Sequence, residues 1–395
     1  MKPRWNTRGQ ITVVTVAFLS VCLELAAAAA AAGPDFAAAA ALLARGIQAR
    51  AFPGCTVAVG TDGKVLWSEA FGHLDYEHKV RVTRKTIYDL ASVTKVAGTT
   101  SVYMRLVALG KLQISDPVCK HLPEFIELAP DEAERAKRRQ VTVEHLLTHT
   151  GGLVAWKPLY RSVSSYPELL REILKFPLET EPGAKFRYSD LGMILLGEIA
   201  SRAGGKPLPE LERELVFSPL GMSDTLRNPS ARLLPRIPPT ENDPQTGKPV
   251  HGVVHDENAR AAGGVTGHAG LFSTAEDLAR HARELLRALD GRSRLFPKEV
   301  ATDFLRVHPI VKDSQRALGW GLVRDADGKY TRAVGHAGFT GTWIWIDPDR
   351  KLYLVLLTNR VHPTRDNDSA TKVRSEVTAA VAKSFDKWLA ASRRD

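Results

Sequence analysis

Strand patterns lie near both ends of this chain, and a mainly helical stretch separates them. Two short apolar runs at 56–59 and 65–70 are joined through Asp62-Gly63, a signal for a tight hairpin. Further strand patterns return at 319–323, 330–335, 342–346 and 352–358. These patterns predict one antiparallel sheet completed by both chain ends, with a helical segment inserted between its strands.

Helical periodicity at 35–50 and 372–389 places one helix at each end of the expected sheet. We therefore expect an α+β fold in which terminal helices flank the sheet. The corresponding domains are a sheet domain from 33–90 and 310–395 and a mainly helical domain from 91–309. We expect the functional site between the two domains.

The middle of the chain carries several helix signals. The run from 96 to 109 is apolar and ends at Gly110, a helix C-terminal signal. Ser273 and Glu276 form a capping-box pattern, and six prolines between 228 and 250 indicate a long surface loop. Other expected helices are 143–148, 167–174, 191–202, 209–216 and 275–289.

Residues 1–32 have the composition of a secretory signal peptide. Three basic residues precede an apolar run at 11–23, and an alanine tract at 26–32 offers small residues for cleavage. A retained membrane anchor is the alternative, but the run is short and Glu24 interrupts it. Residues 19–22 faintly resemble a lipoprotein cleavage site, although Val21 is large for that role. We expect an exported, periplasmic or extracellular protein without a stable membrane span after cleavage.

The net charge narrows the range of partners. Cleavage of the leader would remove three basic residues and one acidic residue, so the formal charge would fall from +10 to +8. Basic residues are spread along the chain and form no long run beyond 137–139, so nucleic-acid binding is disfavoured. A basic surface suits an anionic cell envelope.

Two cysteines, Cys55 and Cys119, remain after cleavage, which is too few for a disulfide framework. Cys55 lies in an apolar strand pattern, so we expect it to be a small buried residue.

The motif Ser92-Val93-Thr94-Lys95 is the first candidate for chemistry. A lysine three residues after a serine lies one turn away on the same helix face, within reach of the hydroxyl proton. In the first turn, free backbone N–H groups can also face a developing negative charge. Alone, this pattern occurs by chance in chains of this length, so it depends on what accompanies it.

Two further patterns accompany it. Tyr188-Ser189-Asp190 precedes a pattern typical of a buried helix. The phenol and the carboxyl group therefore need hydrogen-bond partners or take part in chemistry. Gly335-His336-Ala337-Gly338 precedes a strand, where glycines let a ligand approach backbone N–H groups. The structural alternatives are a packed tyrosine and a glycine-rich turn.

Four segments in this order, 91–95, 146–153, 182–190 and 335–338, resemble the serine β-lactamase and penicillin-binding protein superfamily. The resemblance covers nearly the whole mature chain and is specific for the class C β-lactamase-related branch of peptidases, esterases and amidases. It implies a β-lactamase/transpeptidase-like fold. The superfamily contains enzymes that work through an acyl-enzyme without a cofactor.

Residue roles follow from this resemblance. Ser92 resembles the acylated nucleophile, and Lys95 and Tyr188 resemble its acid/base pair, assigned jointly. Backbone N–H groups of Ser92 and Phe339 resemble the oxyanion hole, and Gly338 lies beside them. His336 stands where many relatives have a lysine.

Two departures from the family pattern affect the chemistry. Asp190 stands where asparagine is frequent in this motif. An ionised Asp190 near Lys95 would favour the charged form of the amine, so the role of general base would shift towards Tyr188. His336 in place of lysine lowers the positive charge that would hold a substrate carboxylate. Strong β-lactamase activity is therefore doubtful, and esters or amides without that carboxylate remain open.

A narrower resemblance concerns 254–259, 263–274 and 357–365, which look like exported hydrolases of peptidoglycan turnover, including penicillin-binding protein 4B and muramyl-peptide amidases. The ligand-type residues His251, His255, Asp256, Glu257 and His268 fall in this region. Their spacing matches no zinc motif, so we expect no metal. His255, Asp256 and His268 are expected to line the cleft.

The sequence thus predicts an exported serine hydrolase acting on amide or ester bonds of peptidoglycan-derived peptides, of the D-alanyl carboxypeptidase or muramyl-peptide amidase type. A carboxylesterase or weak β-lactamase of the same fold is one alternative. A non-catalytic binding protein for cell-wall fragments is another. The expected partner is a small molecule or peptidoglycan fragment, and the oligomeric state stays open.

Overall fold

A computed structural model describes residues 33–244, 246–312, 314–325 and 327–392. The expected signal peptide lies outside the described residues. Within them, no helix is both long and apolar enough to cross a membrane.

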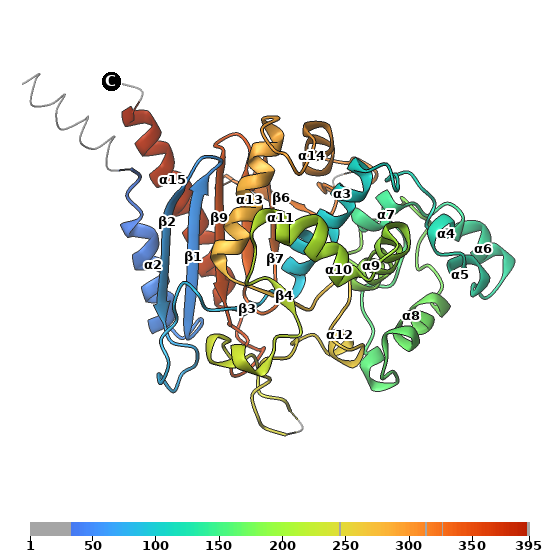
Figure 1. The fold of residues 1–395 in the computed structure, drawn as a ribbon, viewed down its shortest axis with the longest axis horizontal. Helices are drawn as coiled ribbons and strands as arrows, with labels where there is room; N and C mark the ends of the chain where they lie inside the picture. The colour runs from blue at the N-terminus through green and yellow to red at the C-terminus, as the bar shows by residue number, and fades with distance from the viewer. Residues whose placement is uncertain (1–32, 245, 313, 326, 393–395) are drawn as a thin grey trace, which may run out of the picture.

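Both chain ends contribute strands to one six-stranded antiparallel sheet, ordered β2-β1-β9-β8-β7-β6 (Figure 1). Here β1 pairs with β2 through the Asp62-Gly63 turn on one side and with β9 on the other. The expected sheet is therefore confirmed. The strands are β1 (Gly54–Thr61), β2 (Val65–Gly72), β6 (Gly321–Arg324), β7 (Tyr330–Ala337), β8 (Trp343–Asp347) and β9 (Leu352–Thr358).

Helices cover both faces of this sheet, which explains why β1 and β9 are buried almost throughout. The terminal helices α2 (Ala37–Gln48) and α15 (Ala370–Ser392) pack on one face against alternate residues such as Val57 and Leu354. Helix α13 (Ala275–Leu289) packs on the opposite face against Ala58 and Val355 (Figure 1). Cys55 is fully buried in the α15-side core, as expected.

The start of α13 differs from the expected capping box. Thr274 is the N-cap, and its side chain accepts a hydrogen bond from the backbone N–H of Asp277. Ser273 instead ends the short strand β5 (Leu271–Ser273), where its hydroxyl bonds to Thr225. The prediction was wrong by one residue because the strand continues through Ser273. Strands β3 (Tyr88–Asp89) and β4 (Leu226–Arg227) flank β5 in a second, three-stranded sheet.

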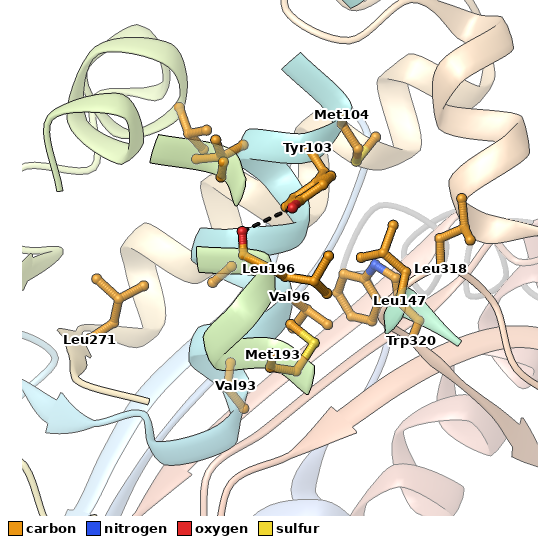
Figure 2. Close-up of a cluster of buried hydrophobic side chains, with 14 of the residues drawn as sticks. Val93, Val96, Tyr103, Met104, Leu147, Met193, Leu196, Leu271, Leu318 and Trp320 are labelled. Carbon is orange, nitrogen blue, oxygen red and sulfur yellow. Dashed lines mark hydrogen bonds between the residues drawn. The ribbon is translucent and has the colours of Figure 1, made fainter. Parts of the chain in front are cut away.

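The inserted helical part lies to the right of the sheet in Figure 1 and packs around the segment that follows Ser92. Figure 2 shows Val93 and Val96 of that segment beside Met193 and Leu196 of α9, where the Tyr103 hydroxyl donates to the Leu196 carbonyl. This core fixes the Ser92 segment against α9. The helices of this part are α3 (Ser101–Ala108), α4 (Val118–His121), α5 (Glu124–Glu127), α6 (Glu132–Arg138), α7 (Val143–Leu147), α8 (Tyr166–Lys175), α9 (Asp190–Gly204), α10 (Leu208–Glu212), α11 (Ser218–Leu220), α12 (Glu257–Ala261) and α14 (Lys298–Leu305).

Candidate active site

Ser92 lies in a tight turn that follows directly on β3. Ala91 has a φ of 44°, a conformation that costs energy for a residue with a side chain. The buried carboxylate of Asp89 holds the turn by accepting from the N–H groups of Ala91 at 2.8 Å and His255 at 2.7 Å. Burial raises the pKa of Asp89. The chain then continues as a 3-10 turn (Ala91–Val93) and a π-helix (Lys95–Thr100) before α3, not as one regular helix.

Lys95 is fully buried and lies against Ser92, as the spacing predicted. Its Nζ is 2.9 Å from Ser92 Oγ, 2.9 Å from the carbonyl oxygen of His268 and 2.7 Å from the Asp190 carboxylate. Burial alone would lower the pKa of this amine, but Asp190 and then Tyr188 outweigh it and raise the pKa to about 12. Lys95 is therefore an ammonium at neutral pH that donates to Ser92 and His268 and forms an ion pair with Asp190.

Tyr188 lies at the start of α9, where Ser189 is the N-cap and accepts from the Gly192 N–H at 3.0 Å. The Lys95 ammonium lies 5.2 Å from the centroid of the Tyr188 ring. The same ring lies between two imidazoles, with centroids 4.6 Å from His149 and 6.1 Å from His336. The structure thus brings together the alcohol, amine and phenol that the sequence singled out.

The turn between β7 and β8 is tied to the residues just before Ser92. Thr340 donates to the Asp89 carbonyl and Thr342 to the Leu90 carbonyl, each at 2.8 Å. A Cβ on Gly338 would lie 2.0 Å from Thr342 Oγ1 and 2.4 Å from the Leu90 carbonyl oxygen, so only glycine fits. Phe339 lies at the tip of this turn and is 46% exposed. Its backbone N–H is therefore carried on a turn fixed to the nucleophile segment.

The two imidazoles beside Tyr188 are neutral at pH 7. Burial, and then the nearby Lys95 and Arg316 cations, hold the pKa of His336 well below its ordinary value. His149 follows the same pattern, and its Nδ1 accepts from the Ser189 N–H at 3.2 Å. His336 Nδ1 donates to the Ala337 carbonyl at 3.0 Å. His336 therefore supplies hydrogen-bonding capacity but no fixed charge.

Sequence reasoning missed a second cation of this region, Arg316. Its charge acts on Tyr188, His149 and His336, and burial lowers its pKa to about 10, so it stays charged at neutral pH. Its guanidinium lies 5.5 Å from the Phe186 ring centroid, and its buried Nε has no hydrogen-bond partner. In the described part of the chain, no carboxylate pairs with it. No motif surrounds Arg316, so no sequence signal pointed to it, whereas His149 lies within the 146–153 segment.

Of the remaining ligand-type residues, Asp256 and His268 bond to each other, and the others bond to groups outside this set. His268 is 1% exposed, and its Nε2 lies 2.9 Å from Asp256 Oδ1. The His255 ring stacks on Phe339, with centroids 5.6 Å apart, and its Nε2 lies 3.4 Å from Glu241. Two members of this group contact the site: the backbone carbonyl of His268 accepts from Lys95, and the ring of His255 packs against the exposed Phe339. Glu257 pairs with Arg365, and His251 Nε2 bonds to the Ile237 carbonyl.

Comparison with known proteins identifies the family of this chain. A protein-family model described as Beta-lactamase matches residues 39–379. A Salmonella typhimurium protein named "Putative D-alanyl-D-alanine carboxypeptidase" is 31% identical over 350 residues, which cover 79% of each chain. A Salmonella typhi protein of the same name is 32% identical over 351 residues, again 79% of each chain.

Solved structures share the fold. EstCE1, described as a hydrolase with promiscuous acyltransferase activity, gives a TM-score of 0.70 at 24% identity, covering 87% of this chain and 97% of its own. A class C beta-lactamase from Rhodobacter sphaeroides gives 0.66 at 20% identity, covering 88% and 98%. The narrower resemblance to penicillin-binding protein 4B and muramyl-peptide amidases stays a prediction. The chain belongs to the beta-lactamase family and is a serine hydrolase of the β-lactamase/transpeptidase-like fold.

Proposed function

We propose that this protein is a D-alanyl carboxypeptidase that releases the terminal residue of peptidoglycan-derived peptides through an acyl-enzyme on Ser92. The convergence of Ser92, Lys95 and Tyr188 carries the proposal, because a pocket that only binds needs no activated serine. The name of the Salmonella relatives supports this substrate class. Export follows from the expected signal peptide and is part of the same proposal.

The acylation step divides the work between the amine and the phenol. Lys95 is already fully protonated, so it cannot take the Ser92 proton and instead stabilises negative charge near Oγ and the phenol. The oxygen of Tyr188 receives that proton while Oγ attacks the scissile carbonyl. The backbone N–H groups of Ser92 and Phe339 stabilise the oxyanion. Tyr188 then gives the proton to the leaving amine, and water later hydrolyses the ester by the same path.

Arg316 supports a substrate with a free carboxylate. Arg316 is half-buried, its buried Nε has no hydrogen-bond partner and no carboxylate pairs with it among the described residues, so it favours an incoming anion, and its planar fork suits a carboxylate. We propose that Arg316, beside the neutral His336, replaces the charge that a lysine supplies in many relatives. The loss of the lysine therefore need not exclude substrates that end in a carboxylate.

The test measures D-alanine release by residues 33–395 from an N-acylated peptide ending in D-Ala-D-Ala. We expect release that is abolished in Ser92→Ala and much slower from the same peptide with a C-terminal amide. A fluorescent penicillin should label the wild type and not Ser92→Ala. Labelling without peptide turnover would overturn the carboxypeptidase proposal, and equal labelling of Ser92→Ala would reject Ser92 as the nucleophile.

A further inference from the structure

The Asp256–His268 pair lies directly behind the proposed acid/base centre. The segment that contains His268 runs along the nucleophile segment and bonds to it at several places, among them the Leu90 N–H, which donates to the Leu271 carbonyl at 2.9 Å. Thr99 donates to the Gly267 carbonyl at 2.7 Å, Lys95 donates to the His268 carbonyl at 2.9 Å, and the Leu271 N–H donates to Thr94 at 3.2 Å. The backbone around residue 268 thus forms one wall of the Lys95 site.

This wall also has no room to shift towards α9. A Cβ on Gly267 would lie 2.1 Å from the Met193 carbonyl oxygen, so the two backbones are already in contact. On the other side, Arg227 donates to the Ala269 carbonyl at 2.9 Å, and residue 268 itself is anchored through its imidazole. The position of the carbonyl that holds Lys95 therefore depends in part on how that imidazole is held.

Both nitrogens of the buried His268 ring are bonded. Nδ1 lies 2.9 Å from Thr266 Oγ1, and Nε2 lies 2.9 Å from Asp256 Oδ1. Asp256 is itself fixed as the N-cap of α12, because its side chain accepts from the Ala259 N–H at 2.8 Å. Burial would raise the pKa of Asp256, but His268 and this N–H hold it well below its ordinary range, so the carboxylate is ionised and Nε2 carries the proton.

We infer that Asp256 and His268 form a positioning pair that keeps the backbone carbonyl of residue 268, and through it the Lys95 ammonium, aimed at Ser92. The inference rests on the proposed acyl-enzyme mechanism and adds two positioning residues to it. Neither side chain is placed in contact with substrate. Their effect reaches the reaction through Lys95, which also donates to Ser92 and forms an ion pair with Asp190.

The test follows the rate at which a fluorophosphonate labels Ser92, which reports serine activation whatever the natural substrate is. We expect His268→Ala to slow labelling about 10- to 100-fold, since an error of about 1 Å in a catalytic group has effects of this size. His268→Gln keeps an N–H at the position of Nε2 and should recover to within about threefold of the wild type. Asp256→Asn keeps the α12 cap but loses the charge, and should fall between the two.

His281→Ala is the matched control, because His281 is also fully buried and bonds to Ser101 at 2.7 Å through its ring. It should lower the melting temperature without slowing the labelling of folded protein. If His268→Ala labels at the wild-type rate, or if His268→Gln recovers nothing in protein shown to be folded by circular dichroism, the positioning pair is wrong. Failure to release D-alanine would count against the carboxypeptidase alone, since labelling does not depend on it.

The double variant asks whether the two residues act as one unit. We expect Asp256→Asn combined with His268→Ala to label no more slowly than His268→Ala alone, within about twofold, because coupled residues are not additive. If the rate of the double variant fell by the product of the two single-variant losses, the two residues would act independently and a shared role would be contradicted.

Discussion

At the residue scale, burial and ion pairing have opposite effects on the pKa of Lys95. Burial lowers the pKa of the amine, whereas Asp190 at 2.7 Å and Tyr188 raise it to about 12. His149 and His336 also face Lys95 but are neutral, and Asp256 adds a more distant negative charge. The ammonium therefore persists well above neutral pH because Asp190, and after it Tyr188, outweigh the effect of burial.

Asp190→Asn should shift the pH dependence of the reaction. Without the carboxylate, burial has the larger effect and the pKa of Lys95 falls, so the ammonium loses its proton at lower pH. The alkaline limb of kcat/KM should therefore move to lower pH, while activity near neutrality changes less. Asp386→Asn, in the exposed α15 pair with Arg350, is the control and should leave the profile unchanged. An unmoved alkaline limb in Asp190→Asn would show that Asp190 does not hold the charge on Lys95.

Arg316→Ala should separate substrates by their charge. The guanidinium is proposed to hold a terminal carboxylate, and hydrogen bonds to charged groups are worth about 1.5–3 kcal/mol, so kcat/KM for the D-Ala-D-Ala peptide should fall about 10- to 100-fold. Turnover of an uncharged p-nitrophenyl ester should change little. Arg316→Lys should retain part of the peptide activity. An equal loss on both substrates would assign Arg316 to the structure of the site and not to substrate binding.

At the element scale, the turn between β7 and β8 couples the sheet to the nucleophile segment. Gly338→Ala would place a Cβ against Thr342 Oγ1 and the Leu90 carbonyl, so the turn has to move away from Ser92. Overpacking of this kind costs about 1–3 kcal/mol, and we expect at least a tenfold slower labelling of Ser92. Gly63→Ala, in the β1–β2 turn, meets its nearest atom at 3.8 Å and is the matched control. Equal labelling by both variants would mean that the turn does not position the site.

Elements with a strong local pattern could be predicted from the sequence, and those set by distant contacts could not. The Asp62-Gly63 hairpin and α13 carry their own turn or period signals, and both lie where expected. The two-residue strands β3 and β4 are too short to show a pattern and exist because β5 pairs with them. The π-helix after Ser92 likewise reflects packing against α9 more than local propensity.

The same division holds for the site. Ser92 and Lys95 are one turn apart, so local geometry was enough to predict their contact. Tyr188 and His336 were placed through the family resemblance, whose segments the structure brings together. Arg316 was missed because its importance lies in having no carboxylate partner in the described structure, and a sequence does not show which charges are left unpaired.

At the scale of the whole molecule, the two hydrophobic cores on opposite faces of the sheet should respond differently to mutation. The core under α2 and α15 contains Phe385, Val57 and Leu354, whereas Val93, Val96 and the helices around the site belong to the other core. Since β1 and β9 are adjacent, the α15 side stabilises the pairing of the two chain ends without contacting Ser92.

Phe385→Ala should therefore lower stability without altering the chemistry. Phe385 is 2% exposed, and removing a buried phenylalanine side chain costs about 3–5 kcal/mol, which urea unfolding should show as a lower midpoint. Labelling of Ser92 by the fluorophosphonate should keep its wild-type rate wherever the variant stays folded. Lys387→Ala, exposed on the same helix, should change neither quantity by much. If labelling by folded Phe385→Ala slowed tenfold, the α15 core would be coupled to the active site through the sheet, and the separation of the two cores would be wrong.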